Sequence, residues 1–138
     1  METFLIFISQ NFIAVTILLI AILGLIIHES RRGGERVDPS LATKIINKQD
    51  GKLLDLRQEK EFNSGHISGS INCDKTQKIQ DKLRDFDKKL PIVLVCQNGA
   101  SSKQAGINLK KSGFDNIYII QNGIAGWKAQ GLPLVKTS

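Results

Sequence analysis

Apolar residues follow two different patterns along this chain. Phe4 to Ile27 carries no charged side chain, and from Phe12 onward the segment is almost purely apolar. As a helix it is about 36 Å long, which is enough to cross the hydrocarbon core of a bilayer. After it, short apolar runs alternate with amphipathic stretches and turn signals. The pattern predicts a transmembrane helix over residues 4–27, a flexible juxtamembrane linker over 28–36 and a folded domain over 37–136.

The second part of the chain has the pattern of alternating strands and helices. The expected strands are Val37, Leu53 to Leu56, Ile92 to Val95 and Ile117 to Ile120, with a brief extended piece between His66 and Asn72. Helices are expected from Pro39, after the N-cap Asp38, to near Lys48, and over residues 58–62, 74–89, 100–111 and 124–130. The alternation predicts an α/β domain with a parallel sheet flanked by helices on both faces. In such sheets ligands bind at the carboxyl ends of the strands.

Charge is distributed unevenly between the two parts. All 19 Lys and Arg residues lie after residue 28, so no basic side chain precedes the apolar segment. Arg31, Arg32 and Arg36 follow it, and the positive-inside rule then places the domain in the cytoplasm and the short N-terminus outside. We therefore expect a single-pass membrane protein in contact with lipid. A cleaved signal peptide is the alternative, but the segment lacks a basic n-region and a small-residue cleavage site.

Composition argues against several kinds of site. The net charge of +6 is compatible with nucleic-acid binding, but Lys82, Lys88 and Lys89 alternate with acids and no aromatic residues interleave with a basic patch. No nucleic-acid partner is therefore expected. Cys73 and Cys96 are the only cysteines, and no Cys/His spacing suits a metal. We expect no disulfide framework, no metal or other cofactor, and a reducing compartment.

One cysteine stands where a nucleophile would be useful. Cys96 follows an apolar run and precedes Gln97, Asn98, Gly99, Ala100, Ser101, Ser102 and Lys103, which open the helix expected over 100–111. Backbone N–H groups and the positive helix end converge at such a position and favour the thiolate, the reactive form of cysteine. Gly99 lets the backbone turn tightly. The segment is predicted to cradle a nucleophile in backbone amides.

Three blocks of sequence resemble the rhodanese family, in the family's order. They are Asp55-Leu56-Arg57 with Glu61-Phe62 and Gly65 to Asn72, then Cys96 with its loop, then Asn122 to Trp127 with Gly131-Leu132-Pro133. The resemblance covers residues 37–135 and implies a rhodanese-like fold. With its apolar segment, the chain looks like the single-domain rhodaneses anchored in the bacterial inner membrane.

The resemblance implies sulfur transfer at Cys96. The thiolate takes the sulfane sulfur of a donor such as thiosulfate or a protein persulfide, becomes a persulfide, and passes the outer sulfur to a thiol acceptor. Backbone N–H groups of Gln97 through Ser102 are expected to hold the terminal sulfur as an anion nest. Lys103 either supplies a positive field or is a solvated helix residue. Arg57 either faces the pocket or braces neighbouring loops with Asp55.

The loop departs from the commonest family pattern at Ser101. Many rhodaneses carry Arg at this position, where it can bind an oxyanion donor in bidentate fashion, whereas Ser101 offers only a hydroxyl. Some single-domain thiosulfate sulfurtransferases are similar to this chain here, with Ser-Ser-Lys after the glycine. Lys103 would then supply the positive charge as a point charge. The serine is therefore expected to affect which donor is used and how fast sulfur is transferred, more than whether Cys96 forms a persulfide.

Structural roles are expected for three other residues. Cys73 is interpreted as an idle thiol, with a resolving partner for the persulfide as the alternative. His66 is interpreted as a hydrogen-bonded structural residue rather than a general base, and Trp127 as part of the core.

The sequence allows two alternatives to sulfur transfer. A rhodanese-like module that docks membrane-protein partners with little or no catalysis is the second candidate. A phosphatase or arsenate reductase is disfavoured, because the loop from Cys96 to Ser101 is shorter than those chemistries use and no Arg occurs from residue 85 to 138.

Overall fold

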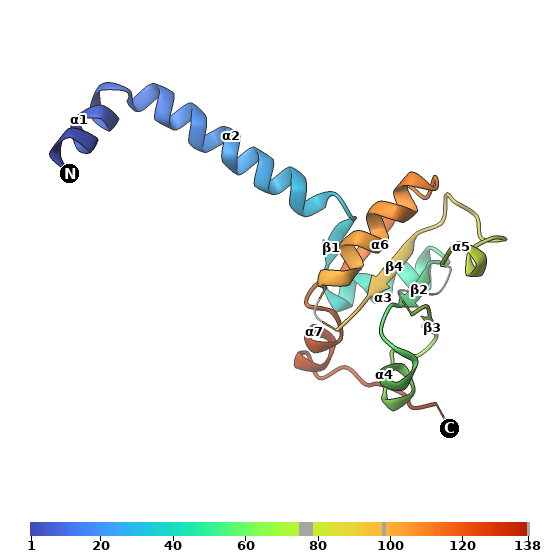
Figure 1. The fold of residues 1–138 in the computed structure, drawn as a ribbon. Helices are drawn as coiled ribbons and strands as arrows, with labels where there is room; N and C mark the ends of the chain where they lie inside the picture. The colour runs from blue at the N-terminus through green and yellow to red at the C-terminus, as the bar shows by residue number, and fades with distance from the viewer. Residues whose placement is uncertain (75–78, 98, 138) are drawn as a thin grey trace. The chain divides into compact units, whose positions relative to one another are not determined.

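The computed structural model describes residues 1–74, 79–97 and 99–137. The chain forms two units, residues 1–31 and residues 32–138. The first unit contains two helices, and the second contains a sheet with its covering helices (Figure 1).

The first unit is not the single helix expected from residue 4. Helix α1 (Glu2–Gln10) ends at Asn11, whose side-chain amide donates to the carbonyl of Phe7, and helix α2 (Phe12–Arg31) follows. Asn side chains compete in this way with the backbone bonds of a helix. Phe12–Glu29 has a mean hydropathy of 2.5 and no buried residue within the structure. By length and composition it suits a membrane span, and a signal sequence near an N-terminus would have the same properties.

The second unit is built on a five-stranded sheet in which every neighbouring pair is parallel, in the order β1-β5-β4-β2-β3. The strands are β1 (Glu35–Val37), β2 (Lys52–Asp55), β3 (Ile71–Asn72), β4 (Ile92–Val95) and β5 (Ile117–Ile120). The register pairs Asp55 with Val95, so β2 and β4 end side by side. The predicted parallel sheet is confirmed, and the residues after β2 and β4 meet at its carboxyl edge.

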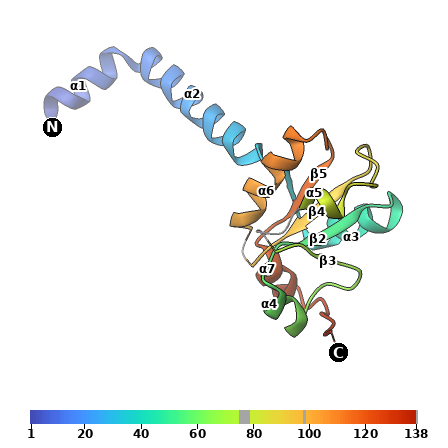
Figure 2. The same ribbon diagram turned by 45° about the vertical axis from the view of Figure 1, so that its right-hand side comes forward.

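Helices cover both faces of the sheet because successive strand residues point to opposite faces. Leu54 and Leu94 belong to an apolar cluster with Leu109 of α6, whereas Leu53 and Val93 belong to a second cluster with α3 and α7. Figure 2 shows the sheet between α6 and α3. The helices are α3 (Pro39–Lys48), α4 (Glu59–Ser64), α5 (Ile79–Lys82), α6 (Ala100–Lys111) and α7 (Gly123–Ala129).

The start of α3 follows the predicted signals. The carboxylate of Asp38 accepts the backbone N–H of Leu41 at 2.8 Å, and Pro39 occupies the first helical position. An N-cap carboxylate satisfies one of the donors that a helix start leaves unpaired. The bounds of α6 also match the sequence pattern.

The helix expected over residues 74–89 is much shorter. Residues 75–78 lie outside the described part of the chain, and α5 ends at Lys82. Leu83 and Phe86 still pack into the apolar cluster under α6, which explains their helical spacing. Beyond them the chain turns, and the carboxylate of Asp87 accepts the backbone N–H of Lys89. Asp favours such local turns over a continued helix.

The flexible linker expected over residues 28–36 is also different in the structure. Helix α2 runs to Arg31 and β1 begins at Glu35, so most of the segment is regular. Gly33 and Gly34 between them are buried. The backbone of Gly33 lies directly against Gly106 of α6, where a side chain on either residue would meet backbone atoms. These glycines allow close approach of two backbones rather than flexibility.

Replacing Gly106 tests this close approach. We expect Gly106→Ala to lower the free energy of unfolding by about 2 kcal/mol or more, because the new methyl group meets the carbonyl of Gly33 and neither backbone can yield cheaply. Urea unfolding of the full chain in detergent, followed by the fluorescence of its only tryptophan, Trp127, measures the change. Lys110→Ala, at an exposed position of the same helix, should stay within about 0.5 kcal/mol of wild type. Equal stability of the two variants would contradict the packing.

Candidate active site

Cys96 lies at the carboxyl edge of the sheet, directly after β4. Its side chain is only 3% exposed, and its Sγ accepts the backbone N–H of Gly99 at 3.0 Å. Gly99 is the N-cap of α6 and has φ +94°, a left-handed conformation that favours glycine. The tight turn brings the start of α6 back toward the thiol. A backbone amide and the positive end of a helix therefore face the sulfur.

A second helix start holds the other side of the loop. The carbonyls of Cys96 and Gln97 accept the backbone N–H groups of Ile124 and Ala125, at 2.8 and 3.3 Å. Both donors lie in the first turn of α7, where N–H groups have no partner within the helix. The Cys96 loop is therefore fixed between the N-termini of α6 and α7. The sequence pointed to α6 at this site, but it did not indicate this role of α7.

Cys96 opens into a pocket of about 220 Å³. Its lining mixes the Cys96 loop with the segment that follows β2, and it consists of Leu56, Arg57, Gln58, Glu61, Asp74, Cys96, Gln97 and Ser101. The volume suits a small sulfur compound or the tip of a partner's side chain. Sequence reasoning missed Gln58 and Asp74 as lining residues. Leu56 and Glu61 belonged to the first family block without an assigned place at the site.

Arg57 both lines this pocket and braces its wall. Its guanidinium contacts the fully buried carboxylate of Asp55, with Nη2 at 2.8 Å from Oδ2 and Nε at 3.0 Å from Oδ1. The same Nη2 donates to the carbonyl of Gly65 at 2.6 Å. Breaking such a buried pair by removing one partner costs about 3–5 kcal/mol, because the other charge is left uncompensated. Arg57 therefore faces the pocket and braces the neighbouring loops with Asp55, which were the two roles expected for it. Its contact with a substrate stays a prediction.

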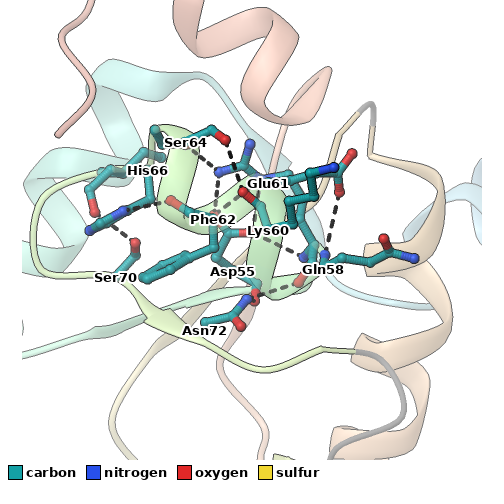
Figure 3. Close-up of polar contacts among 12 residues, drawn as sticks. Asp55, Gln58, Lys60, Glu61, Phe62, Ser64, His66, Ser70 and Asn72 are labelled. Carbon is teal, nitrogen blue, oxygen red and sulfur yellow. Dashed lines mark hydrogen bonds and ion pairs between the residues drawn. The ribbon is translucent and has the colours of Figure 1, made fainter. Parts of the chain in front are cut away.

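The remaining residues of the first block form a scaffold around Asp55 (Figure 3). The side-chain amide of Asn72 donates to the carbonyls of Asp55 and Arg57. The ring of His66 stacks on Phe62, with centroids 3.8 Å apart, and its Nδ1 lies 2.9 Å from the carbonyl of Phe62. His66 does not line the pocket, so its structural interpretation is confirmed.

The expected core role of Trp127 is confirmed as well. Trp127 is buried in the cluster beneath α7, and its indole N–H donates to the carbonyl of Pro133 at 3.0 Å.

The predicted loop residues take different positions. Gln97 and Ser101 are exposed and line the pocket, whereas Ser102 is fully buried and its hydroxyl has no partner within the described part of the chain. Lys103 is half-buried and is not among the lining residues found for the pocket. Ala100 is exposed in the first turn of α6. Asn98, also expected to bind substrate, lies outside the described residues.

The second cysteine differs from the first. Cys73 is fully buried in the same apolar cluster as Cys96, and both are free thiols. Burial raises the pKa of the Cys73 thiol; Lys82 opposes this effect, and the Asp55 carboxylate adds to it. A thiol of this kind is mostly protonated near neutral pH, which fits an idle residue. Among the described residues, no cluster of His, Cys, Asp or Glu could hold a metal ion.

Comparison with known proteins gives the same assignment along most of the second unit. The family model described as a rhodanese-like domain matches residues 38–130. The uncharacterized protein YibN of Escherichia coli strain K12 is 35% identical over 97 residues, covering 69% of this chain and 68% of that protein. The thiosulfate sulfurtransferase GlpE of Pseudomonas putida strain F1 is 30% identical over 95 residues, covering 69% of this chain and 86% of that protein.

Solved structures show the same fold at lower sequence identity. The polysulfide-sulfur transferase homodimer from Wolinella succinogenes superposes with a TM-score of 0.65 at 24% identity, covering 86% of this chain and 90% of that one. The rhodanese-like domain of an Anabaena protein gives a TM-score of 0.63 at 22% identity, covering 74% of this chain and 79% of that one. The chain belongs to the rhodanese-like domain family and is related to bacterial single-domain sulfurtransferases.

Proposed function

We propose that this protein is a sulfurtransferase that carries sulfane sulfur as a persulfide on Cys96. The observation that carries the proposal is the position of the thiol: Cys96 lies at a pocket, at the end of β4, with the N–H of Gly99 on its sulfur. Membership of a family that includes thiosulfate sulfurtransferases supports the same chemistry. Thiosulfate, a polysulfide or a protein persulfide would serve as the donor and a thiol as the acceptor.

The proposed reaction has two balanced steps. In the first, the Cys96 thiolate attacks the outer sulfur of thiosulfate, a new S–S bond forms, and the old S–S bond breaks so that sulfite leaves with the electron pair. In the second, an acceptor thiolate attacks the outer sulfur of the persulfide, and Cys96 leaves as the thiolate. Covalent catalysis of this kind divides one transfer into two easier displacements.

The loop is suited to stabilise the negative charge on sulfur, both in the free thiolate and in the persulfide. The N–H of Gly99 and the start of α6 face the sulfur, and they stabilise a thiolate or a persulfide anion without moving. The hydroxyl of Ser101 and the amide of Gln97 stand at the pocket and can donate to a bound donor. The hydrogen bonds from α7 keep the loop in this shape during turnover.

Intact mass spectrometry tests the persulfide. Incubation of the full chain in detergent with thiosulfate, and separately with a polysulfide, should add one sulfur atom, about 32 Da, at Cys96. Cys96→Ser should abolish the adduct, whereas Cys73→Ser should retain it, because Cys73 lies outside the lining found for the pocket. An adduct that persists in Cys96→Ser would show that another residue carries the sulfur. No adduct from any donor would favour a docking module instead.

Alkylation by iodoacetamide tests the contrast between the cysteines. Because burial raises the pKa of Cys73, its thiolate fraction at neutral pH is lower than that of an exposed cysteine. We expect Cys73 to be labelled slowly at neutral pH and faster as the pH rises, whereas Cys96 is labelled faster than Cys73 because it lines a pocket that the reagent can enter. Peptide mass spectrometry as a function of pH measures both rates. Equal labelling of the two cysteines at neutral pH would contradict the assignment.

We further infer that α2 is a retained anchor of the inner membrane, with the second unit in the cytoplasm. The inference rests on the apolar length of Phe12–Glu29 and on the three arginines that follow within residues 31–36. A tether of this kind would keep the Cys96 site near the membrane face, where membrane-bound sulfur donors or acceptors are accessible.

Membrane extraction and protease protection test the anchor. In Escherichia coli the full chain should stay with the membrane at alkaline pH, and external protease should leave its second unit intact in spheroplasts. A chain that lacks residues 4–27 should be soluble. A shortened mature N-terminus would instead identify a cleaved signal sequence, and digestion from outside would reverse the proposed orientation.

A further inference from the structure

The Cys96 loop brings no cationic side chain to the described lining of the pocket, since Lys103 is not among the lining residues. Ser101, which does line the pocket, offers only an uncharged hydroxyl. Among the described residues that line the pocket, Arg57 is the only cationic one, and its guanidinium is bound to Asp55 and to the carbonyl of Gly65. The same lining contains the carboxylates of Glu61 and Asp74. An anionic donor such as thiosulfate therefore meets little net positive charge from the β2 side of the pocket.

A second arginine reaches the loop from the opposite side. A methyl group on the Cα of Gly99 would lie 3.0 Å from Nη1 of Arg36. Gly99 is also the residue whose N–H lies 3.0 Å from the sulfur of Cys96. The Arg36 guanidinium and the Cys96 thiol therefore lie near the same residue of the loop, although Arg36 is distant from Cys96 in sequence.

The sheet order produces this approach. Arg36 lies on β1, which pairs with β5, and β5 pairs with β4, whose last residue precedes Cys96. Val37 is 2% exposed and packs in the cluster beneath α3 and α7. Because neighbouring strand residues point to opposite faces, Arg36 points toward the face that α6 covers. Arg36 is exposed, and its Nη1 lies beside Gly99, the N-cap of that helix.

We propose that Arg36 is a specificity-determining residue that supplies positive charge at the rim of the Cys96 loop, beside Gly99. The inference rests on the proposed function, since it takes Cys96 as the reactive thiol. The guanidinium is permanently charged, and it binds oxyanions through two parallel N–H groups. From the rim it attracts anionic sulfur donors to Cys96 and favours them over neutral ones.

Competition between two alkylating reagents tests this role without knowledge of the natural donor. Iodoacetate is an anion and iodoacetamide is neutral, and both alkylate the same thiolate. Both rates are proportional to the thiolate fraction of Cys96, so this fraction drops out of their ratio. The ratio then reports the electric potential near the sulfur. The full chain in nonionic detergent is the sample, and peptide mass spectrometry separates Cys96 from Cys73.

We expect Arg36→Gln to lower the iodoacetate-to-iodoacetamide ratio about two- to threefold, as expected for one charge a few ångströms beyond contact in a solvated site. Arg36→Lys should restore most of the ratio. Salt should lower the wild-type ratio and have less effect on Arg36→Gln, because screening acts on the charge that has been removed. Arg84→Gln is the matched control: it removes the same charge from a 77% exposed side chain that lines a different pocket with Lys88 and Phe114, and it should leave the ratio unchanged.

Each outcome separates this inference from the proposed function. An unchanged ratio in Arg36→Gln, with normal labelling of Cys96, overturns the role of Arg36 alone. An equal fall in Arg84→Gln also overturns it, because the effect would then come from net charge. Failure of both reagents to label Cys96 in the wild-type protein overturns the proposed function, and this inference with it. The fluorescence of Trp127 verifies that each variant is folded.

Discussion

The Cys96 site depends on a loop that is held by the starts of two helices at once. On one side Gly99 turns back so that its N–H reaches the sulfur, and on the other side α7 donates two N–H groups to the carbonyls of Cys96 and Gln97. Each helix start has N–H groups without partners in the helix, and the loop satisfies some of them. Backbone hydrogen bonds therefore fix the loop around the thiol, and the apolar cluster under α6 buries Cys96 from the other side.

The opposite wall of the pocket is fixed by a buried ion pair. Asp55 ends β2, and its carboxylate holds Arg57, which in turn holds the carbonyl of Gly65. Asn72 completes the arrangement through the carbonyls on either side of Leu56. The pairing neutralises most of the charge that Arg57 would otherwise bring to the pocket. The residues of the first family block thus act mainly as scaffold for the pocket wall that faces the loop after β4.

The electrostatic character of the site follows from which strands are neighbours. The β2 side contributes Glu61 and Asp74 to the lining, and the β1 side brings Arg36 to the rim near Gly99. A loop arginine would have combined binding and charge in one residue. Here Lys103 is the charged residue of the loop segment and is not among the lining residues, whereas Arg57, Glu61 and Asp74 bring charge to the lining from other segments. The same strand, β1, directly follows the segment after the apolar helix, and Gly33 and Gly34 seat it against α6.

Much of the fold was readable in the sequence because its signals are local. The apolar runs of β4 and β5, the capping residues of α3 and the bounds of α6 depend on burial, capping and turn residues close by in the chain. The same local information identified Cys96 and Gly99. Local sequence signals did not predict that the helix before β4 would end at Lys82. Leu83 and Phe86 have helical spacing because both pack into the apolar cluster, and Asp87 turns the chain after them. Nor did local signals distinguish glycines that confer flexibility from Gly33, which packs on Gly106. The sequence by itself determined the class of domain and placed Cys96 at the carboxyl end of a strand. Only the tertiary structure decided which distant residues surround that thiol, because the contacts of α7, Asp74 and Arg36 arise from the order of strands in the sheet.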